Sequence, residues 1–403
     1  PDGSTRPPRP EESVKIEAEQ LVPRDGQYVL KVAEPMDEVT YLDRVQLVVL
    51  DHPADVRVYP DERFADPPPS QKLFSFKQTV FPESARDHRG RDVTAKLRAW
   101  DRDTVDGFAK RAWVGFAEEH TVELDFGGRL AAYGPADRLV LCLAGWTEYP
   151  YPESIWAAQQ AGVAMLPPVL ERQGPDRRWQ KVCEAGFPAG LPKLMTLDVT
   201  GKLTGPACRL RLRTNLQVFW DQVFVAAGCR DVAVPSAGPV RATALEVSAA
   251  DLKPCGLMQE FSPDGRQPTL YDHDRYESVP VVRLAGRMTR YGDVTELLRA
   301  RDDRFVLFGP GDEVTLRFDA KSLPPLPAGW KRSFVLRTWG YCKDAAPFTA
   351  TGGTVEPLPF AAMSKYPYGP DEHYPKDALH EEYRRRYNTR EVAPERFPAK
   401  PRR

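Results

Sequence analysis

The residues best suited to binding a metal ion are three aspartates in one short loop, Asp101, Asp103 and Asp106, which Gly107 follows. Calcium takes several hard oxygens that converge on one point, and a glycine permits the sharp turn that such loops need. The spacing approaches the D-x-D-x-D-G pattern, but one additional residue precedes the third acid. The segment is therefore predicted to be either a Ca²⁺ site or a polar, Asp-rich exit from a helix.

Motifs of enzyme chemistry are absent from the sequence. It contains no G-x-S-x-G, H-E-x-x-H, Walker or G-x-G-x-x-G pattern, and Gly309 and Gly311 flank a proline in what reads as a turn. The six histidines stand far apart, and His52 and His88 sit beside turn residues. The chain is therefore predicted not to be an enzyme. The alternative is a catalytic site assembled from dispersed His and Asp residues.

Aromatic residues are the stronger candidates for ligand binding. Residues 145–156 read GWTEYPYPESIW and contain four large rings beside acids, namely Trp146, Tyr149, Tyr151 and Trp156. Sugar-binding sandwiches present such rings because the C–H face of a sugar stacks on an aromatic plane while its hydroxyls need polar partners. The segment therefore predicts a polysaccharide site. The alternative is that the rings pack a long loop onto the protein.

Composition excludes several classes of partner. The net charge is −1, which argues against a nucleic-acid-binding surface. No apolar run approaches the ~18 residues that a membrane-spanning helix needs. The 40 prolines are about twice the usual share and favour loops, edge strands and extended arms. Long loops around β-sheets fit this composition better than a helical bundle does.

The six cysteines include no C-x-x-C pair, so zinc-ribbon spacing is absent. Cys208 alternates with Leu210 and Leu212, which favours a buried free thiol on one face of a strand. Cys229 and Cys255 flank one excursion of the chain and could close it as a disulfide. Neither outcome alone decides the cellular compartment of the protein.

Strand patterns dominate the chain. Residues 121–126 (TVELDF) and 208–213 (CRLRLR) alternate apolar and polar side chains, as half-buried antiparallel strands do. Residues 139–145 are nearly all apolar, which is typical of a central sandwich strand. The predicted fold is mainly β, with two related jelly-roll-like β-sandwich halves, short helices and Pro-rich arms.

An internal repeat supports the two halves. Residues 92–101 (DVTAKLRAWD) and 293–302 (DVTELLRARD) share seven of ten residues. The same order and offset relate later blocks: Val122, Leu124 and Phe126 match Val314, Leu316 and Phe318, and residues 139–145 match 334–340. A helix beginning at Asp92 is therefore expected to superpose on one beginning at Asp293.

The closing strand of the first half, residues 219–223, resembles residues 41–45 near the N-terminus. The second half lacks such a strand after Tyr341, so the N-terminal strands are expected to complete it. The alternative is two unrelated amphipathic strands.

The expected divisions are an N-terminal arm over 1–13, strands of the second sandwich over 14–71, the first sandwich over 72–227, the second over 228–345 and a C-terminal arm over 346–403.

The C-terminal arm is rich in proline and tyrosine and shows no period-2 strand. A short helix is expected from Asp377 to about Tyr387, with Leu379 and Tyr383 four residues apart on one face. Tyrosine is common at protein interfaces. Leu379, Tyr383 and Tyr387 are therefore predicted to dock on a partner subunit.

Several segments together resemble a known family. They are residues 25–47, residues 51–60, the Ala85-Arg-Asp-His88-Arg-Gly-Arg-Asp92 segment, Leu197-Asp198-Val-Thr-Gly201, Trp220-Asp221 and residues 355–368. They resemble the C-terminal region of bacterial proteins that carry FG-GAP repeats and an ASPIC/UnbV segment, relatives of cartilage acidic protein. The chain lacks the propeller repeats in which that family's calcium loops are expected.

This resemblance implies an exported, cell-surface or periplasmic binding protein, and it supplies no catalytic residues. The leading hypothesis is a non-catalytic extracytoplasmic scaffold that associates with other protein subunits. A carbohydrate-binding module that uses residues 146–156 is the first alternative, and an enzyme with an unrecognised site is the second.

Overall fold

The computed structural model describes residues 11–65, 68–203, 208–278 and 283–394. These residues form strands β1 to β26, the α-helices α1 (Pro152–Gln160) and α2 (Ala378–Arg386), and three short 3-10 helices. Every pairing between named strands is antiparallel. The mainly β fold predicted from the alternating apolar pattern is confirmed.

The first sandwich consists of two sheets packed face to face. One has the order β11 (Trp179–Glu184), β10 (Val169–Gln173), β13 (Arg209–Leu216), β8 (Phe116–Asp125) and β7 (Ser84–Asp87). The other has the order β12 (Lys193–Asp198), β9 (Leu139–Thr147), β14 (Val218–Ala227) and β6 (Gln78–Val80). The apolar residues of the alternating strands β8 and β13 face β9 and β14 and form one core, which includes Val122, Leu124, Leu210 and Leu141.

The second sandwich uses strands from both ends of the chain. One sheet has the order β1 (Glu11–Ile16), β25 (Trp330–Asp344), β3 (Glu38–Pro53), β17 (Arg241–Glu246) and β16 (Ser236–Ala237), with β23 (Val306–Phe308) also on β3. The other has the order β2 (Gln27–Ala33), β24 (Asp312–Asp319), β18 (Ala249–Pro254) and β22 (Gly292–Asp293). The strand β1 thus begins inside the segment expected to be an arm.

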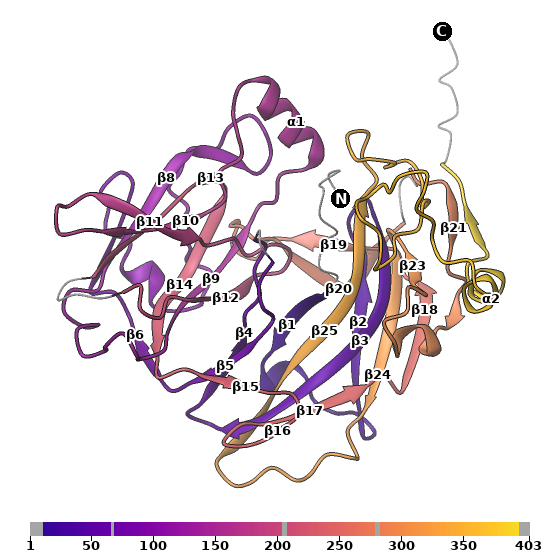
Figure 1. Cartoon of the computed structure of the whole chain (residues 1–403), viewed down its shortest axis with the longest axis horizontal. Coiled ribbons are helices and arrows are strands. Elements are labelled where there is room, and N and C mark those ends of the chain that lie inside the picture. The colour runs from indigo at the N-terminus through magenta and orange to yellow at the C-terminus, as the bar shows by residue number, and fades with distance from the viewer. Residues whose placement is uncertain (1–10, 66–67, 204–207, 279–282, 395–403) are drawn as a thin grey trace.

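A third, central sheet lies between the two sandwiches. It contains β15 (Arg230–Val232), β5 (Leu73–Phe76) and β4 (Arg57–Pro60). Tyr59 and Phe74 pack against the outer face of β9 and β14, whereas Val58 and Leu73 pack against the outer face of β3 and β25. Both faces are therefore buried, and this sheet joins the two sandwiches (Figure 1).

Each sandwich has an aspartate at the equivalent β-bulge. Asp221 interrupts the pairing of β14 with β9, and its carboxylate accepts from the backbone N–H groups of Asp101 and Arg102 at 3.1 and 3.0 Å. Asp43 interrupts the pairing of β3 with β25 and accepts from the N–H of Asp302 at 3.2 Å. A bulge leaves one residue unpaired and re-aims its side chain, so each aspartate holds the loop that follows a repeat block.

The repeat blocks also begin alike. The hydroxyl of Thr94 accepts from the N–H of Ala85 at 2.7 Å, and that of Thr295 accepts from the N–H of Ala250 at 2.8 Å. Each block contains a short 3-10 helix, η2 (Ala95–Leu97) or η3 (Thr295–Leu298), in place of the longer helices expected. The strands β2 and β3 pair with β24 and β25 as β13 and β14 pair with β8 and β9. The second sandwich is therefore a circular permutation of the first.

The C-terminal segment packs onto the second sandwich. Its Val355, Phe360, Tyr374 and other apolar side chains belong to the core of that sandwich. The strand β26 (Arg390–Val392) pairs with β21 (Gly286–Met288). The predicted helix is present as α2, capped by Asp377, which accepts from the N–H groups of two residues in its first turn.

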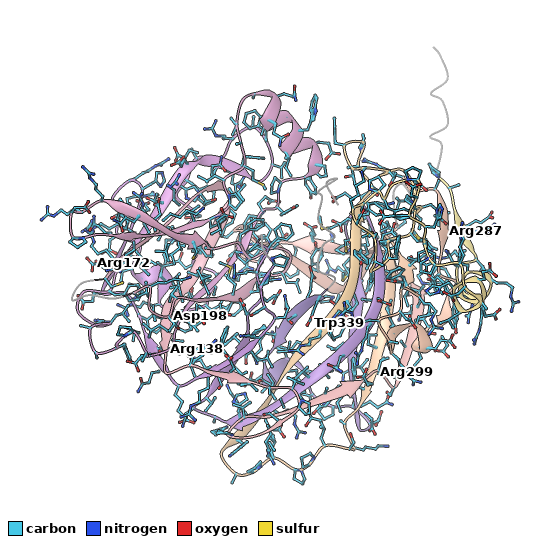
Figure 2. All side chains as sticks on the ribbon, viewed as in Figure 1. Arg138, Arg172, Asp198, Arg287, Arg299 and Trp339 are labelled. Carbon is cyan, nitrogen blue, oxygen red and sulfur yellow. The ribbon has the colours of Figure 1, made fainter. Side chains whose placement is uncertain are left out.

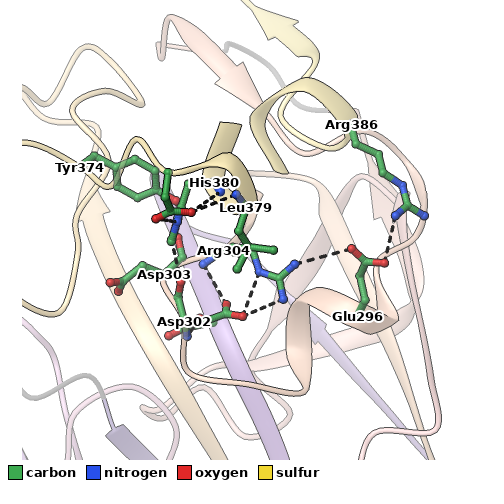
Figure 3. A network of polar contacts seen from close by, with 10 residues as sticks. Glu296, Asp302, Asp303, Arg304, Tyr374, Leu379, His380 and Arg386 are labelled. Carbon is green, nitrogen blue, oxygen red and sulfur yellow. Dashed lines mark hydrogen bonds and ion pairs between the residues drawn. The ribbon is translucent and has the colours of Figure 1, made fainter. Parts of the chain in front are cut away.

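The docking face predicted on α2 is wrong for two of its three residues, because they are buried. Tyr383 and Tyr387 are only 2% and 3% exposed, and the Tyr383 hydroxyl donates to the Phe305 carbonyl at 2.8 Å. His380 bonds the Asp302 carbonyl at 2.9 Å, beside the ion pairs of Arg304 (Figure 3). The chain itself therefore covers Tyr383 and Tyr387, and Leu379, at 50% exposed, is the member of the predicted face that remains at the surface.

The cysteines are free. Cys229 is buried against the first sandwich beside Cys142, whereas Cys255 directly follows β18 in the second sandwich and bonds the Gly311 carbonyl at 3.3 Å. These two thiols belong to different layers, so the disulfide considered between them does not form. Cys208 is buried, as its alternating strand predicted.

We expect Gly340→Ala to lower the free energy of unfolding by about 1–3 kcal/mol, because a Cβ there would collide with the Tyr41 carbonyl beside the Asp43 bulge. Urea denaturation measures the change. Gly353→Ala is the matched control, since no atom lies within 4 Å of its Cβ position. Equal stability of the two variants would show that the bulge tolerates a side chain.

Replacing Tyr383 with Ala is expected to destabilise the protein by about 3–5 kcal/mol, since it removes a buried ring from the core. Leu379→Ala on the exposed side of the same helix should change stability by less than about 0.5 kcal/mol. Thermal or urea unfolding compares them. A neutral Tyr383→Ala would mean that α2 is not anchored to the second sandwich.

Candidate functional site

The four aromatic residues predicted to bind a ligand divide into two pairs. Trp146 packs on Phe219 at 5.6 Å between ring centroids, and Tyr149 packs on Phe64 at 5.7 Å. These contacts hold the loop to the protein and leave both rings partly buried, so their role as ligand contacts stays a prediction. Tyr151 and Trp156 are 43% and 47% exposed and stay available.

Trp156 stacks on a ring from the other half of the molecule. It lies on α1, and Phe348 follows β25; their ring centroids are 4.8 Å apart with planes at 21°. Phe348 is 49% exposed, so both rings also face solvent. In Figure 1, α1 stands beside the segment that follows β25 at one end of the molecule. The stack joins the two sandwiches at their surface.

Carboxyl groups gather near Tyr151, the residue that precedes α1. Glu34 and Glu38 flank the turn between β2 and β3, and Asp344 ends β25. Glu34 accepts from the Thr40 hydroxyl at 2.7 Å and from the Met36 N–H at 3.0 Å, and Glu38 shares a hydrogen bond with Asp344. We call Glu34, Glu38, Asp344, Tyr151, Trp156 and Phe348 the junction site.

The carboxyl groups of the junction site are protonated more readily than usual. Burial, together with the charges of Glu34 and Asp344, raises the pKa of Glu38 to about 8. Burial also raises the pKa of Glu34 and of Asp344. The same burial, and then the carboxylates of Glu148 and Glu260, raises the pKa of Tyr151. These carboxyl groups beside an exposed tyrosine therefore hold their protons to a higher pH than usual.

A metal ion could be held beside these acids. Ligand atoms of Glu34, Glu38 and Cys342 lie within 4.8 Å of one another, and the Cys342 sulfur is 3.6 Å from the Thr40 hydroxyl. Carboxylate oxygens with one sulfur suit a borderline metal such as zinc better than calcium. The sequence did not point to this group because its members come from β25 and from the turn before β3.

The three aspartates predicted to bind calcium do not converge on an ion position. The Lys96 ammonium lies 2.7 Å from Asp103 and 4.0 Å from Asp106, and Asp103 also pairs with Arg266 at 3.0 Å. Asp101 accepts from the Asp103 N–H at 3.1 Å. The charge of the loop is balanced by the chain's own cations, so the calcium assignment is corrected.

This loop instead anchors a hairpin from the other half. The strands β19 (Leu257–Phe261) and β20 (Leu270–Glu277) form a two-stranded sheet after β18. The turn of the hairpin carries Asp264 and Arg266, which pair with Arg102 at 3.1 Å and with Asp103 at 3.0 Å. The hairpin also carries Glu260 and thereby adds charge next to the junction site.

One Ser–His contact has the geometry of a catalytic pair. His52 Nε2 lies 2.9 Å from Ser333 Oγ, and its Nδ1 lies 3.0 Å from the Pro53 carbonyl. The residues are 1% and 0% exposed. Substrates cannot reach a nucleophile that is sealed in this way, so the pair is a satisfied core contact.

We expect stability to depend on pH through Glu38. Between pH 4.5 and about 8 the folded chain retains a proton on Glu38 that the unfolded chain releases, so the free energy of unfolding falls as pH rises through this window. Glu38→Gln cannot ionise and should gain stability relative to the unsubstituted chain from pH 5 to pH 9. Denaturant titrations at both pH values measure this gain.

The exposed Glu19→Gln serves as the control and should show no such trend. A Glu38→Gln chain whose relative stability is the same at pH 5 and pH 9 would contradict the raised pKa. Because Glu38 interacts with Glu34 and Asp344, the pH dependence lost in Glu38→Gln belongs to the three carboxyl groups together.

Comparison with protein-family models, with curated proteins and with solved structures yields no match for this chain. Among the described residues, no helix combines the length and apolar character required to cross a membrane. What the junction site binds therefore has to be inferred from its own side chains.

Proposed function

We propose that this chain is a non-catalytic binding protein and that it uses the junction site to hold another protein subunit in a larger assembly. The observation that carries the proposal is the stack of Trp156 on Phe348. Each ring comes from a different sandwich, and about half of each remains exposed. A stack that served only to join the sandwiches would stabilise the fold more if both rings were fully buried.

Interfaces between proteins are enriched in aromatic residues at their centre and are polar at their rim. The junction site has this composition, because Tyr151, Trp156 and Phe348 are exposed next to the carboxylates of Glu38 and Asp344. Lys or Arg side chains on a partner would stabilise the ionised form of these acids, so we expect binding of a basic surface to release protons from them. The partner that fits is therefore a protein surface with an apolar centre and Lys or Arg around it.

Polysaccharide is the second candidate ligand. Tyr151 and Trp156 present ring faces beside Glu148, and rings with adjacent carboxylates can stack on a sugar and accept from its hydroxyls. Trp146 and Tyr149 are partly buried against Phe219 and Phe64, which leaves a smaller exposed platform. A protein partner is favoured because the platform crosses two sandwiches.

We also propose that this protein is located outside the cytoplasm. Its support is the resemblance of residues 25–47, 51–60 and 355–368 to the C-terminal region of FG-GAP and ASPIC/UnbV proteins. Those proteins resemble exported binding and adhesion proteins. Fractionation of the native source, followed by identification of the proteins that co-purify with the chain, tests the location and the partner together.

We expect Trp156→Ala combined with Phe348→Ala to weaken partner binding, because a stacked aromatic pair contributes about 0.5–1.5 kcal/mol beyond the area that it buries. Affinity for the co-purified partner, and separately for a polysaccharide panel, measures the loss. Leu326→Ala, another exposed apolar residue, is the control and should bind normally. Retention of both affinities by a folded double variant would assign the rings to sandwich packing alone.

A further inference from the structure

The two sandwiches differ along one side, where the first sandwich has a hairpin that the second lacks. In the first sandwich β10 pairs with the outer edge of β13, and β11 pairs with β10. The strand β2 takes the place of β13 in the second sandwich, since it pairs with β24 as β13 pairs with β8. Figure 2 shows Arg172 of β10 on the first sandwich and Trp339 of β25 on the second. Among the described residues, no strand pairs with the outer edge of β2.

The backbone of β2 has unpaired groups along this edge. Gln27 exchanges hydrogen bonds of 2.9 and 2.8 Å with Arg24, on the side away from β24. The backbone groups of an antiparallel strand alternate between its two sides, so the N–H and C=O groups of Val29, Lys31 and Ala33 also point away from β24. They have no hydrogen-bond partner in the part of the chain that the structure describes. Such an edge is a template for a further strand.

The edge also lacks the features with which proteins usually block such pairing, which are short strands, prolines and bulges. The strand β2 has seven residues, none of them proline, and no bulge interrupts its pairing with β24. Among the described sheets of three or more strands, it is the longest edge strand. The edge is therefore long and regular enough to accept another strand.

Apolar side chains of β2 are more exposed than their counterparts in the first sandwich. Leu30 and Val32 correspond to Leu210 and Leu212 of β13, because the internal repeat matches the residues of β24 and β8 with which they pair. Leu210 and Leu212 are 0% and 1% exposed, whereas Leu30 and Val32 are only partly buried. The second sandwich is therefore incompletely covered at β2.

The edge strand of the facing sheet, β1, shows the same difference. Its Val14 and Ile16 occupy the positions of Leu197 and Val199 in the first sandwich. Leu197 and Val199 are 5% and 0% exposed, whereas Val14 and Ile16 are partly buried. A ring of β2 packs on a ring of β25, the neighbour of β1, with centroids 4.8 Å apart, so β1 and β2 border the same side.

The hairpin of the first sandwich shows which side chains close this side. Leu170 of β10 pairs with Leu212 and is 0% exposed. Glu171, the next residue, pairs with Arg211 and accepts from its Nε at 2.6 Å. An apolar residue followed by an acid therefore fits the edge of β13.

The strand β2 has the matching positions. Val32 and Lys31 stand where β13 has this leucine and this arginine. The Lys31 side chain is 54% exposed and lies 3.3 Å from Glu313, which also pairs with Lys253 at 3.2 Å. Two cations and one anion leave a net positive charge, and opposite charges on neighbouring strands stabilise their pairing. An incoming strand with an acid opposite Lys31 is therefore favoured.

We propose that the outer edge of β2 binds an extended segment of another protein as an additional antiparallel strand. This segment has an apolar residue opposite Val32 and an acid opposite Lys31, and it covers Leu30. A second copy of this chain fits less well, since its β2 would bring another Lys31 and no acid. The proposal does not depend on the function proposed for the junction site.

A synthetic peptide with the sequence of residues 168–185, the β10–β11 hairpin, is the probe, because the second sandwich lacks an element of this form. Fluorescence anisotropy with the whole chain measures binding, and hydrogen exchange measures the protection of the amides of Val29, Lys31 and Ala33. We expect the hairpin peptide to bind and to slow the exchange of these amides at least about tenfold. A peptide of scrambled sequence should do neither.

Two results would overturn the proposal. One is the absence of both binding and slowed exchange at peptide concentrations up to about 1 mM. The other is slowed exchange without peptide that increases with the concentration of the chain, because this would assign the edge to a second copy.

Val29→Pro removes an N–H group from the edge without removing a hydrogen bond of the fold, and proline is tolerated at such positions. We expect it to weaken binding of the hairpin peptide at least about fivefold, because the incoming strand loses a hydrogen bond and meets the proline ring. Val29→Ala is the matched control, since it keeps the N–H group and should bind nearly as well as the unsubstituted chain.

Lys31→Glu should weaken binding about threefold to tenfold, because it places two acids opposite each other. A hairpin peptide that carries Glu171→Lys should recover this loss with Lys31→Glu and bind the unsubstituted chain poorly. Lys376→Glu, at another exposed lysine, is the control and should bind normally. Equal binding by Val29→Pro, Lys31→Glu and the unsubstituted chain would show that the peptide binds elsewhere and would overturn the assignment. If Val29→Pro fails to fold, the exchange of charges at Lys31 decides alone.

Discussion

The arrangement of the molecule depends on a small sheet that is buried on both faces. In β4 and β5, neighbouring residues such as Val58 and Tyr59 point to opposite sides, and each side meets the outer face of a sandwich. A sandwich strand normally keeps its outer side chains in water. Here the outer faces of β9 and β3 are apolar instead, so neither sandwich is complete without the central sheet. This sheet packs on both sandwiches and thereby sets how they lie where Trp156 meets Phe348.

The shared bulge explains how two sandwiches with different chain orders keep one geometry. In each, an aspartate leaves the ladder opposite a glycine that lets the strands approach closely, Gly145 for Asp221 and Gly340 for Asp43. The carboxylate then satisfies backbone donors of a loop. Because these contacts are between strands and not along the chain, they survive when the closing strand comes from the N-terminus. Duplication followed by permutation is the simplest origin of such a pair.

Local patterns in the sequence were enough to predict the fold class. The candidate sites could not be predicted in the same way, because they depend on contacts between residues far apart in the sequence. The alternation in residues 121–126 and 208–213 follows from burial of one strand face, so it predicted those strands correctly. Phe348 carried no local signal, since its role appears only when β25 brings it to α1. Asp103 was misassigned because the neutralising Lys96 and Arg266 belong to other segments. Trp146 and Tyr149 looked like Tyr151 and Trp156 in sequence, and only the loop path separates packed rings from exposed ones.

The junction site departs from the way in which the rest of the chain arranges its buried charges. There, carboxyl groups lie together and share protons. Elsewhere the chain pairs its buried charges, as Arg332 does with Asp51 and Arg390 with Asp312. Leaving one partner of a buried pair out is strongly destabilising, whereas an apolar replacement is often neutral. Acids grouped at such a cost in stability, at the turn between β2 and β3 and the end of β25, support the proposal that the cations of a partner complete them.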